Sequence, residues 1–420
     1  MAVEDVRPSV DPAIASDPTT SGVARHRPPT AAPDVEDHSV GAALVALLDV
    51  ASASTSDLAS IVGAVGSILG ARSARLLVAD YSLNSLRYLA NEIEDGHGVP
   101  PAMEGTLAGR AFSRGETLVS GDRVCVPVSE NSERIGVLEM DHPAWEEVPE
   151  DLIDPVVRIL TLILVSKRRY TDAMLRTRRT EELSLAAEMQ WGLLPPLSCT
   201  TPKVSVSGIL EPAYSIGGDS FDFAFNADMV EFGIIDAVGH GMSAVLISTV
   251  AINGLRNARR EGRGLESAYA DTGRAIASQF GDDAFVTGQI GSLDLPSGNL
   301  SWLNAGHPLP LLIRNGAYAD ELSCRPSIPM GLGGTVKEVA VEHLQAGDCV
   351  LFYTDGVTET RSADGDQFGV PRLVDFLVRA VNDGLAPVET LRSLSAAILA
   401  YSGTGLSDDA TLVMIEYHGP

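Results

Sequence analysis

The chain has 420 residues, of which 45% are hydrophobic and 20% are charged. This length and composition predict two or three domains with packed cores, and they exclude a chain that is disordered throughout. Acidic residues outnumber basic residues by 56 to 30, and the resulting net charge of −26 opposes direct binding to nucleic acid or to anionic lipid.

Residues 1–40 contain six of the 24 prolines, mixed with Ser, Thr and Asp. Such a segment has too little apolar surface to offset the entropy that is lost on folding, so we expect a disordered tail. The first residues lack the basic and apolar pattern of a secretory signal.

A domain of mixed α and β structure is predicted for residues 41–165. Apolar residues recur at steps of three and four over 44–50 and 58–69, which predicts two helices. Strand-like segments follow at 74–79, 85–90, 124–128 and 134–140, and a helix is expected from about 149 to 165. This order, with the hairpin VCVPVSENSERIGVLEM, resembles a GAF sensory domain. The resemblance implies that residues 41–165 receive a small-molecule or protein signal.

The segment 166–196 is expected to connect two domains. No Gly or Pro interrupts it from Lys167 to Trp191, and Pro195 and Pro196 end it, so the pattern predicts one continuous helix. Two interpretations stay open. The helix pairs with a second copy as a coiled coil, which would make the protein a homodimer, or it is a solitary connecting helix.

The four cysteines, Cys125, Cys199, Cys324 and Cys349, are widely spread, which argues against a disulfide framework or a structural zinc site and suits a reducing compartment. The most apolar run, 156–165, contains Arg158 and is shorter than a membrane helix needs. A cytoplasmic protein without membrane segments is therefore expected.

Four aspartates beyond residue 196 lie in Gly-rich motifs beside apolar runs. Asp219 lies in GGDSFD, Asp236 follows FGII, Asp355 follows VLFYT, and Asp408 precedes ATLVMI. One aspartate beside a glycine is commonly a turn or helix-capping residue. Four at strand boundaries indicate carboxylates that converge on one point, which is the ligand set of hard cations such as Mg²⁺ or Mn²⁺.

The motifs GGDSFD, DAVGHG, LNAGHPLPLLI, PMGL, YTDGVTET and SDDATLVMIE, in this order, resemble the SpoIIE/RsbU-type branch of the PPM (protein phosphatase 2C-like) serine/threonine phosphatases. The resemblance implies an αββα sandwich over residues 197–420, so the fold class of the whole chain is α+β. It also implies two Mn²⁺ or Mg²⁺ ions. Their ligands, which are also the residues expected to carry catalysis, are implied to be Asp219, Asp236, Asp355 and Asp408, with the carbonyl of Ala237 as a further metal ligand.

Other polar residues of these motifs are expected to support the site. The roles of Asp222, as a ligand or a structural group, and of His240, as an acid or a capping residue, stay open. Asn304 and His307 are expected to shape a tight turn, and Asp409 and Glu359 are expected to make supporting hydrogen bonds.

The prediction from sequence is a sensor-regulated, metal-dependent protein phosphatase that acts on phosphoserine or phosphothreonine. The resemblance implies a phosphorylated anti-sigma factor antagonist of the STAS fold as the substrate. Two alternatives stay open: a catalytically silent module that binds a partner, and a hydrolase of small phosphate esters.

Overall fold

The computed structural model describes residues 40–53, 57–89, 102–212, 214, 217–403, 405–406 and 408–420. The tail that is predicted for residues 1–40 lies outside the described residues, except for Val40 at the start of the first helix. Among the helices of the described ranges, none is both long and apolar enough to cross a membrane.

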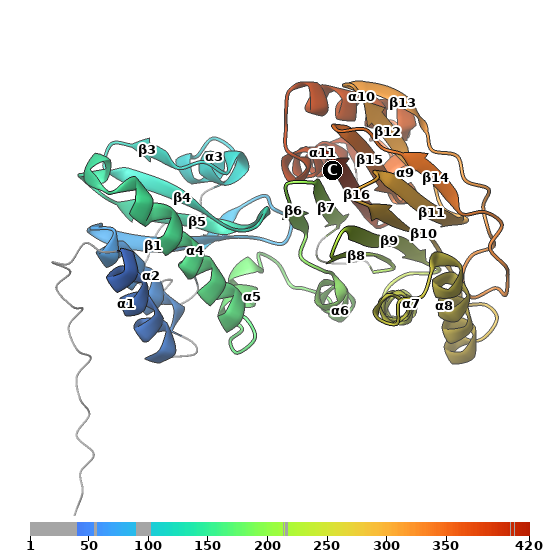
Figure 1. The fold of residues 1–420 in the computed structure, drawn as a ribbon, viewed down its shortest axis with the longest axis horizontal. Helices are drawn as coiled ribbons and strands as arrows, with labels where there is room; N and C mark the ends of the chain where they lie inside the picture. Colours follow the sequence, from blue (N-terminus) through green and yellow to red (C-terminus); the bar gives the residue numbers. More distant parts are fainter. Residues whose placement is uncertain are drawn as a thin grey trace, which may run out of the picture. The chain divides into compact units, whose positions relative to one another are not determined.

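The N-terminal domain is a five-stranded antiparallel sheet with helices on both faces (Figure 1). The strand order is β2-β1-β5-β4-β3. Its elements are α1 (Val40–Ala53), α2 (Leu58–Ile68), β1 (Ser73–Ala79), β2 (Leu86–Tyr88), α3 (Leu107–Arg114), β3 (Leu118–Ser120), β4 (Arg123–Glu130), β5 (Glu133–Asp141) and α4 (Glu150–Lys167).

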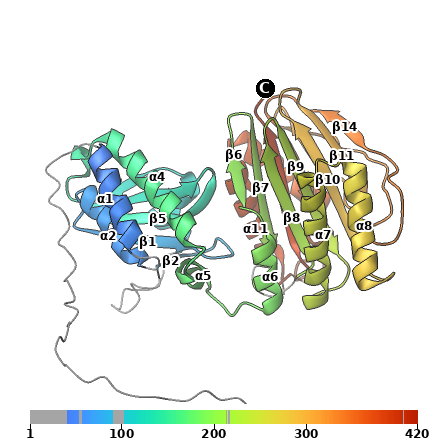
Figure 2. The same cartoon turned by 60° about the horizontal axis from the view of Figure 1, so that its bottom comes forward.

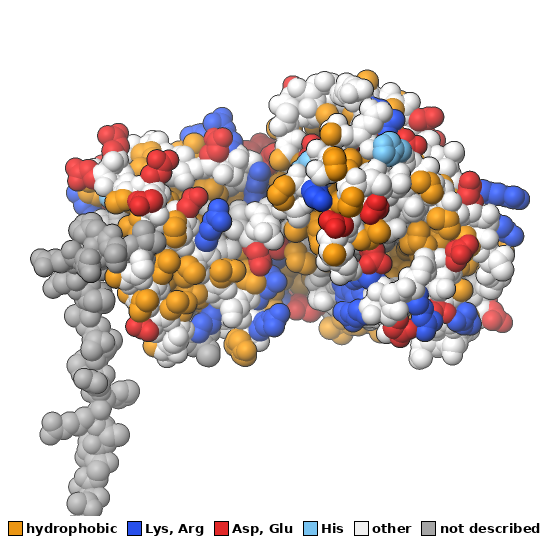
Figure 3. Space-filling view, in the orientation of Figure 1, with side chains coloured by type: hydrophobic (Ala, Val, Ile, Leu, Met, Phe, Trp, Pro, Cys, Tyr) orange, Lys and Arg blue, Asp and Glu red, His pale blue; other side chains and the backbone are white. Residues whose placement is uncertain are grey.

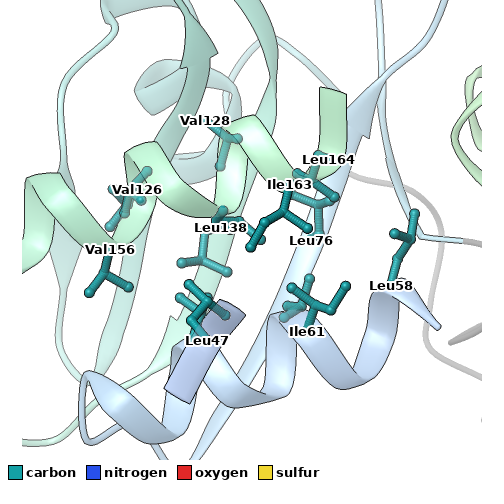
Figure 4. Packing of buried hydrophobic residues seen from close by; sticks show 14 of the residues in the cluster. Leu47, Leu58, Ile61, Leu76, Val126, Val128, Leu138, Val156, Ile163 and Leu164 are labelled. Carbon is teal, nitrogen blue, oxygen red and sulfur yellow. The ribbon is translucent and has the colours of Figure 1, made fainter. Parts of the chain in front are cut away.

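Successive side chains of each strand point to opposite faces of the sheet, so the apolar residues of this domain form two cores. Leu76 and Leu138 face α1, α2 and α4, whose apolar residues cover that face of the sheet (Figure 4). Leu77 and Val137 point to the other face, where they pack against α3. The predicted helices and strands are confirmed within a few residues at their ends, whereas α3 and β3 were not predicted. The assignment to the GAF family stays a prediction.

The prediction of one continuous helix from Lys167 to Trp191 is wrong. Helix α4 ends at Lys167 and is followed by α5 (Ala173–Arg178) and α6 (Leu185–Leu193). Between α5 and α6, the Thr180 hydroxyl lies 2.7 Å from the Tyr214 hydroxyl, and the Ser184 amide donates to the Tyr214 carbonyl. These tertiary hydrogen bonds hold the segment in a non-helical conformation, and the Ser184 hydroxyl then caps α6 by accepting from the Ala187 amide at 3.1 Å.

In its described residues, the C-terminal domain consists of two antiparallel sheets and five helices in addition to α6. The first sheet has the order β14-β11-β10-β9-β8, and the second has the order β13-β12-β15-β16-β7-β6. The strands are β6 (Ser198–Thr200), β7 (Val204–Glu211), β8 (Asp219–Asn226), β9 (Met229–Ala237), β10 (Val286–Asp294), β11 (Asn299–Ala305), β12 (Leu311–Arg314), β13 (Ala317–Glu321), β14 (Ala340–His343), β15 (Asp348–Tyr353) and β16 (Ala410–Tyr417). The helices are α7 (Met242–Arg260), α8 (Leu265–Phe280), α9 (Asp355–Glu359), α10 (Gly369–Asn382) and α11 (Pro387–Tyr401).

These elements form four layers, as predicted for residues 197–420. Between the two sheets lies a core that includes Phe221 and Phe232 of the first sheet and Phe352 of the second. The outer face of the first sheet packs against α7 and α8, and that of the second packs against α10 and α11. Figure 2 shows α7 and α8 in front of the first sheet. The αββα arrangement is thus confirmed.

Charged side chains of both signs lie on the one face of the molecule that Figure 3 draws. On the face drawn in Figure 3, Lys and Arg side chains of the described residues are scattered among Asp, Glu and apolar side chains. That face therefore offers no continuous basic stripe of the kind that binds a nucleic-acid backbone.

Candidate metal centre

The four predicted aspartates lie at corresponding ends of the two sheets. Asp219 opens β8 and pairs in register with Asp236, near the end of β9, in the first sheet. Asp355 follows β15 and Asp408 precedes β16, and these two strands are neighbours in the second sheet. Rigid strands therefore bring carboxylates from both sheets to one edge of the sandwich.

Hydrogen bonds join the two sheets at this edge. The Thr354 hydroxyl donates to Oδ2 of Asp219 at 2.7 Å, and the amide of Asp219 donates to Oδ2 of Asp409 at 3.1 Å. The amide of Thr411 in turn donates to the Thr354 hydroxyl at 2.9 Å. Asp219 of the first sheet is thus fixed by two residues from the loops of the second sheet, Thr354 and Asp409, and Thr411 in turn holds Thr354.

Burial and mutual repulsion raise the pKa values of the aspartates that gather at this edge. Asp219 is 3% exposed, and burial, followed by the charges of Asp236 and Asp409, raises its pKa well above the usual range. Burial and the neighbouring carboxylates, Asp355 first among them, raise the pKa of Asp236 to about 7. Burial raises the pKa of Asp409 to about 6. The pKa of Asp355 is raised by burial and then by the charges of Glu359 and Asp408.

In the described part of the chain, none of these carboxylates makes an ion pair with Arg, Lys or His. The cluster consists of Asp219, Asp236, Asp355, Asp408 and Asp409, and one oxygen of Asp409 is buried without a hydrogen-bond partner. Uncompensated carboxylate oxygens in this number fit the charge and the ligand preference of divalent cations. Within the described residues, no three acidic, His or Cys side chains lie close enough together to hold a metal ion.

Glycines beside the aspartates allow close approach of the backbone. A Cβ on Gly218 would lie 3.3 Å from the carbonyl oxygen of Ala237, and a Cβ on Gly356 would lie 1.9 Å from the carbonyl oxygen of Asp409. The glycine of TDG is therefore required by packing around the acidic cluster, whereas a side chain at Gly218 would make a tight contact. Ile216 and Ser407, which belong to the predicted motifs, lie outside the described residues.

Asp222 does not join the cluster. Its Oδ1 accepts from Arg256 at 2.7 Å and its Oδ2 lies 2.7 Å from Arg259, and its side chain is 3% exposed. Two guanidinium groups compensate this buried carboxylate, so it connects β8 to α7 instead of serving as a free ligand.

The remaining motif residues are placed near turns. His240 is exposed, and its carbonyl accepts from the Ser243 hydroxyl at 3.3 Å, at the start of α7. The Asn304 amide donates to the carbonyl of His307 at 2.8 Å, and its oxygen accepts from the amide of His307 at 2.7 Å. Burial lowers the pKa of His307 to about 3. Asn304 and His307 therefore shape the turn between β11 and β12, as predicted.

Sequence reasoning missed the contacts of Thr354 and Gln190 with the cluster. Thr354 stands directly before Asp355 in YTDG, so its position beside the motif was a signal. Gln190 lies on α6, and its amide donates to the main-chain oxygen of Asp219 at 2.7 Å and to Oδ2 of Asp409 at 3.3 Å. No local pattern indicates a contact between residues 219 positions apart.

Comparisons with known proteins identify one family and several relatives of this chain. Residues 226–418 match the family Stage II sporulation protein E (SpoIIE). Protein IcfG of Synechocystis sp. is 26% identical over 56% of this chain and 41% of its own length. Phosphoserine phosphatase RsbU of Bacillus subtilis is 19% identical over 64% of this chain and 82% of its own length. The solved RsbU and RsbW domains of Rv1364c from Mycobacterium tuberculosis are 26% identical, with a TM-score of 0.45, over 53% of this chain and 63% of theirs.

The C-terminal part of the chain is thus similar to SpoIIE-type phosphatases of the PPM family. The matched residues include Asp236, Asp355 and Asp408, whereas Asp219 precedes the matched range. The chain spans less than half the length of IcfG.

Proposed function

We propose that residues 197–420 hydrolyse phosphoserine or phosphothreonine esters of a protein with the help of two Mn²⁺ or Mg²⁺ ions. The observation that carries this proposal is the uncompensated carboxylate cluster at one edge of the sandwich, in which the pKa of Asp236 is raised to about 7. Such a cluster repels a phosphate dianion, so a phosphatase with this site requires cations. When bound, the two cations supply an activated water and neutralise the phosphoryl oxygens.

The chain's own residues have distinct tasks in this proposal. Asp219, Asp236, Asp355 and Asp408 would hold the ions, together with the carbonyl of Ala237. Asp219 is nearly inaccessible to solvent, whereas Asp355 and Asp408 are exposed. The phosphoryl group is therefore expected to approach from the side of Asp355 and Asp408, with Asp219 at the base of the site.

The test is hydrolysis of an aryl phosphate by the full chain with added Mn²⁺. Asp236→Asn and Asp355→Asn keep side-chain size but remove charge, so both are expected to lose metal-dependent turnover. Asp320→Asn, on the exposed strand β13, is a matched control that should retain it. If the wild-type protein neither binds Mn²⁺ nor hydrolyses the aryl phosphate, the result would favour a catalytically silent module that binds a partner.

We infer the substrate class from the family resemblance: a phosphorylated anti-sigma factor antagonist of the STAS fold. The rate of phosphate release is measured with a phosphoserine protein or peptide and with a nucleotide at equal concentration. This comparison discriminates the proposal from a small-ester hydrolase. Faster release of phosphate from the nucleotide would contradict it.

We further propose that residues 41–165 act as a GAF-like sensor that regulates the phosphatase, with a homodimer as the functional unit. Deletion of residues 1–165 is expected to change turnover or Mn²⁺ affinity. Unchanged values of both would contradict regulation, and a monomeric mass in sedimentation would contradict the dimer.

A further inference from the structure

A small cavity lies away from the acidic cluster, within the compact unit that residues 37–420 form. Its volume is about 110 Å³. Residues of β1, β5, α3, α4, α5 and α11 contribute to its walls, and none of the five aspartates of the cluster lines it. Most of the lining side chains are apolar, among them Val78, Phe112, Ile135, Leu164, Met174 and Leu197.

The size of the cavity limits the ligand that it can accept. An engineered cavity of about 150 Å³ in another protein holds benzene, whereas sites for drug-sized ligands and cofactors span roughly 300–1,000 Å³. A cavity of about 110 Å³ therefore excludes a nucleotide or a haem. It suits a short aliphatic group.

Arginines supply most of the charge at the cavity. One acid, Glu133, lines it together with four arginines: Arg134, Arg168, Arg178 and Arg392. Two of the arginines share one acid outside the lining, because Arg134 and Arg392 pair with Glu389 at 2.9 and 2.7 Å. Arg168 and Arg178 make no ion pair in the described part of the chain. The cavity therefore retains positive charge that an anionic group can neutralise.

The guanidinium group of Arg178 is stacked on aromatic rings. Its Cζ lies 4.4 Å from the ring centroid of Tyr81 and 5.6 Å from that of Trp191. Burial lowers the pKa of this guanidinium, which means that its charge is incompletely compensated. Stacking covers the face of a guanidinium and leaves the N–H groups on its edge for an acceptor such as a carboxylate.

Glu133 is the complementary group. Its Oε2 is buried and has no hydrogen-bond partner among the described residues. Burial raises the pKa of Glu133, and the charges of Arg168 and Arg178 act in the opposite direction, so these groups lie near one another without direct pairing. A buried carboxylate oxygen usually has a donor. An ammonium group would supply one here.

We propose that this cavity binds a small aliphatic α-amino acid. The aliphatic side chain occupies the apolar cavity, the ammonium group donates to Glu133, and the carboxylate accepts from Arg168 and Arg178. A simple carboxylic acid would leave Glu133 without a donor, and an amine would leave the two guanidinium groups without an acceptor. The proposal goes beyond the proposed function and does not rest on it, because no aspartate of the acidic cluster takes part.

The first test compares L-valine with molecules that lack one of its features. The full chain is titrated by calorimetry in EDTA, which removes metal ions that amino acids bind, and we expect a Kd for L-valine below about 1 mM. Isovalerate has no ammonium group and isobutylamine has no carboxylate. Each should bind at least about 10-fold more weakly, because each leaves a charged group of the site unpaired. L-Tryptophan, whose side chain exceeds the cavity, should also bind more weakly.

Substitutions assign each charged group of the ligand to its partner. Glu133→Gln keeps side-chain size and should weaken the binding of L-valine at least about 10-fold without weakening that of isovalerate. Arg168→Gln and Arg178→Gln should weaken the binding of L-valine without weakening that of isobutylamine. Glu146→Gln is the matched control, because Glu146 is exposed on the N-terminal domain and does not line the cavity. It should bind L-valine as the wild type does.

Several outcomes would overturn the proposal. They are absence of L-valine binding, isovalerate or L-tryptophan binding as tightly as L-valine, and equal losses of affinity in Glu133→Gln and Glu146→Gln. The comparison of ligands uses the unaltered chain, so it decides the matter even if a variant does not fold. These titrations contain neither Mn²⁺ nor a phosphate ester, so their failure leaves the proposed phosphatase activity untouched. Failure of that activity would instead appear in Mn²⁺ binding and in hydrolysis of the aryl phosphate.

Discussion

The acidic cluster should make the metal-free protein less stable as the pH rises. The pKa of Asp236 rises from 3.8 in the unfolded chain to about 7 in the folded protein. Between these values the unfolded state has released a proton that the folded state still holds, so the free energy of unfolding decreases with pH. The loss begins near the unfolded value, grows up to about pH 7 and is complete above it.

The magnitude follows from the pKa difference. A rise of about 3 pKa units corresponds to about 4 kcal/mol at 1.36 kcal/mol per unit. Asp409, whose pKa rises from 3.8 to about 6, interacts with Asp236, so the two contributions overlap. We expect the cluster to lower the free energy of unfolding by about 2–4 kcal/mol between pH 5 and pH 8.

Urea unfolding in EDTA at several pH values, followed by fluorescence, measures this effect. Trp302 lies in the core between the two sheets, so a variant with Trp145→Phe and Trp191→Phe reports on the C-terminal domain. Asp236→Asn should flatten the pH dependence, and the difference between the two curves isolates the contribution of this carboxylate. Added Mn²⁺ should restore stability most strongly at pH 8. Identical pH dependence in the parent and in Asp236→Asn would show that the Asp236 carboxylate does not lower stability at high pH.

Three further substitutions test the packing around the site and the N-terminal domain. Gly356→Ala should destabilise the protein by about 1–3 kcal/mol in urea unfolding and weaken Mn²⁺ binding, because its Cβ would collide with the carbonyl of Asp409. Arg256→Met removes one of two guanidinium groups from buried Asp222. It should cost about 3 kcal/mol in the same assay without changing the number of Mn²⁺ ions that bind. Asp57→Ala removes the cap of α2, where Oδ1 accepts from the Ser60 amide at 3.0 Å, and should lower thermal stability by about 1 kcal/mol.

Each of these three predictions has a result that would contradict it. Gly264→Ala is the control for Gly356→Ala, because Gly264 has a φ of −70° and open space around its Cβ position. Equal behaviour of the two alanine variants would argue against a close approach at residue 356. Fewer bound Mn²⁺ ions in Arg256→Met would mean that Asp222 is not solely structural. An unaltered thermal midpoint in Asp57→Ala would show that the cap contributes nothing.

Local signals in the sequence account for two helices of the C-terminal domain. Apolar residues recur at helical spacing over 265–280 and 387–401, which are the bounds of α8 and α11. Both helices have a regular apolar stripe, and each begins beside a residue that favours a helix start, Gly264 in one case and Pro387 in the other. These signals depend only on neighbouring residues, so they are visible in the sequence.

The connecting segment was not predictable in the same way. Residues 167–191 have helical composition, but Thr180 and Ser184 bind Tyr214, which lies beyond the segment in the chain. Tertiary contacts of this kind override helix propensity, because a helix of this length gains little stability without packing.

Part of the candidate site is likewise indicated by local sequence signals, and part of it is not. The four aspartates are visible because each lies in a short motif at a strand boundary, and the topology brings these boundaries together. The hydrogen bond from Gln190 to Asp409 joins residues that lie far apart in the chain. No local periodicity encodes such a contact, and only the folded arrangement of α6, β8 and β16 discloses it.

Aspartates from the two sheets are proposed to form one divalent-cation site, and calorimetric titration of the metal-stripped full chain with Mn²⁺, beside Asp236→Asn, tests this. We expect about two ions to bind per chain, as in two-metal hydrolytic sites, and at least one of them to be lost in the variant. Absence of binding, or identical isotherms for the two proteins, would contradict a shared site.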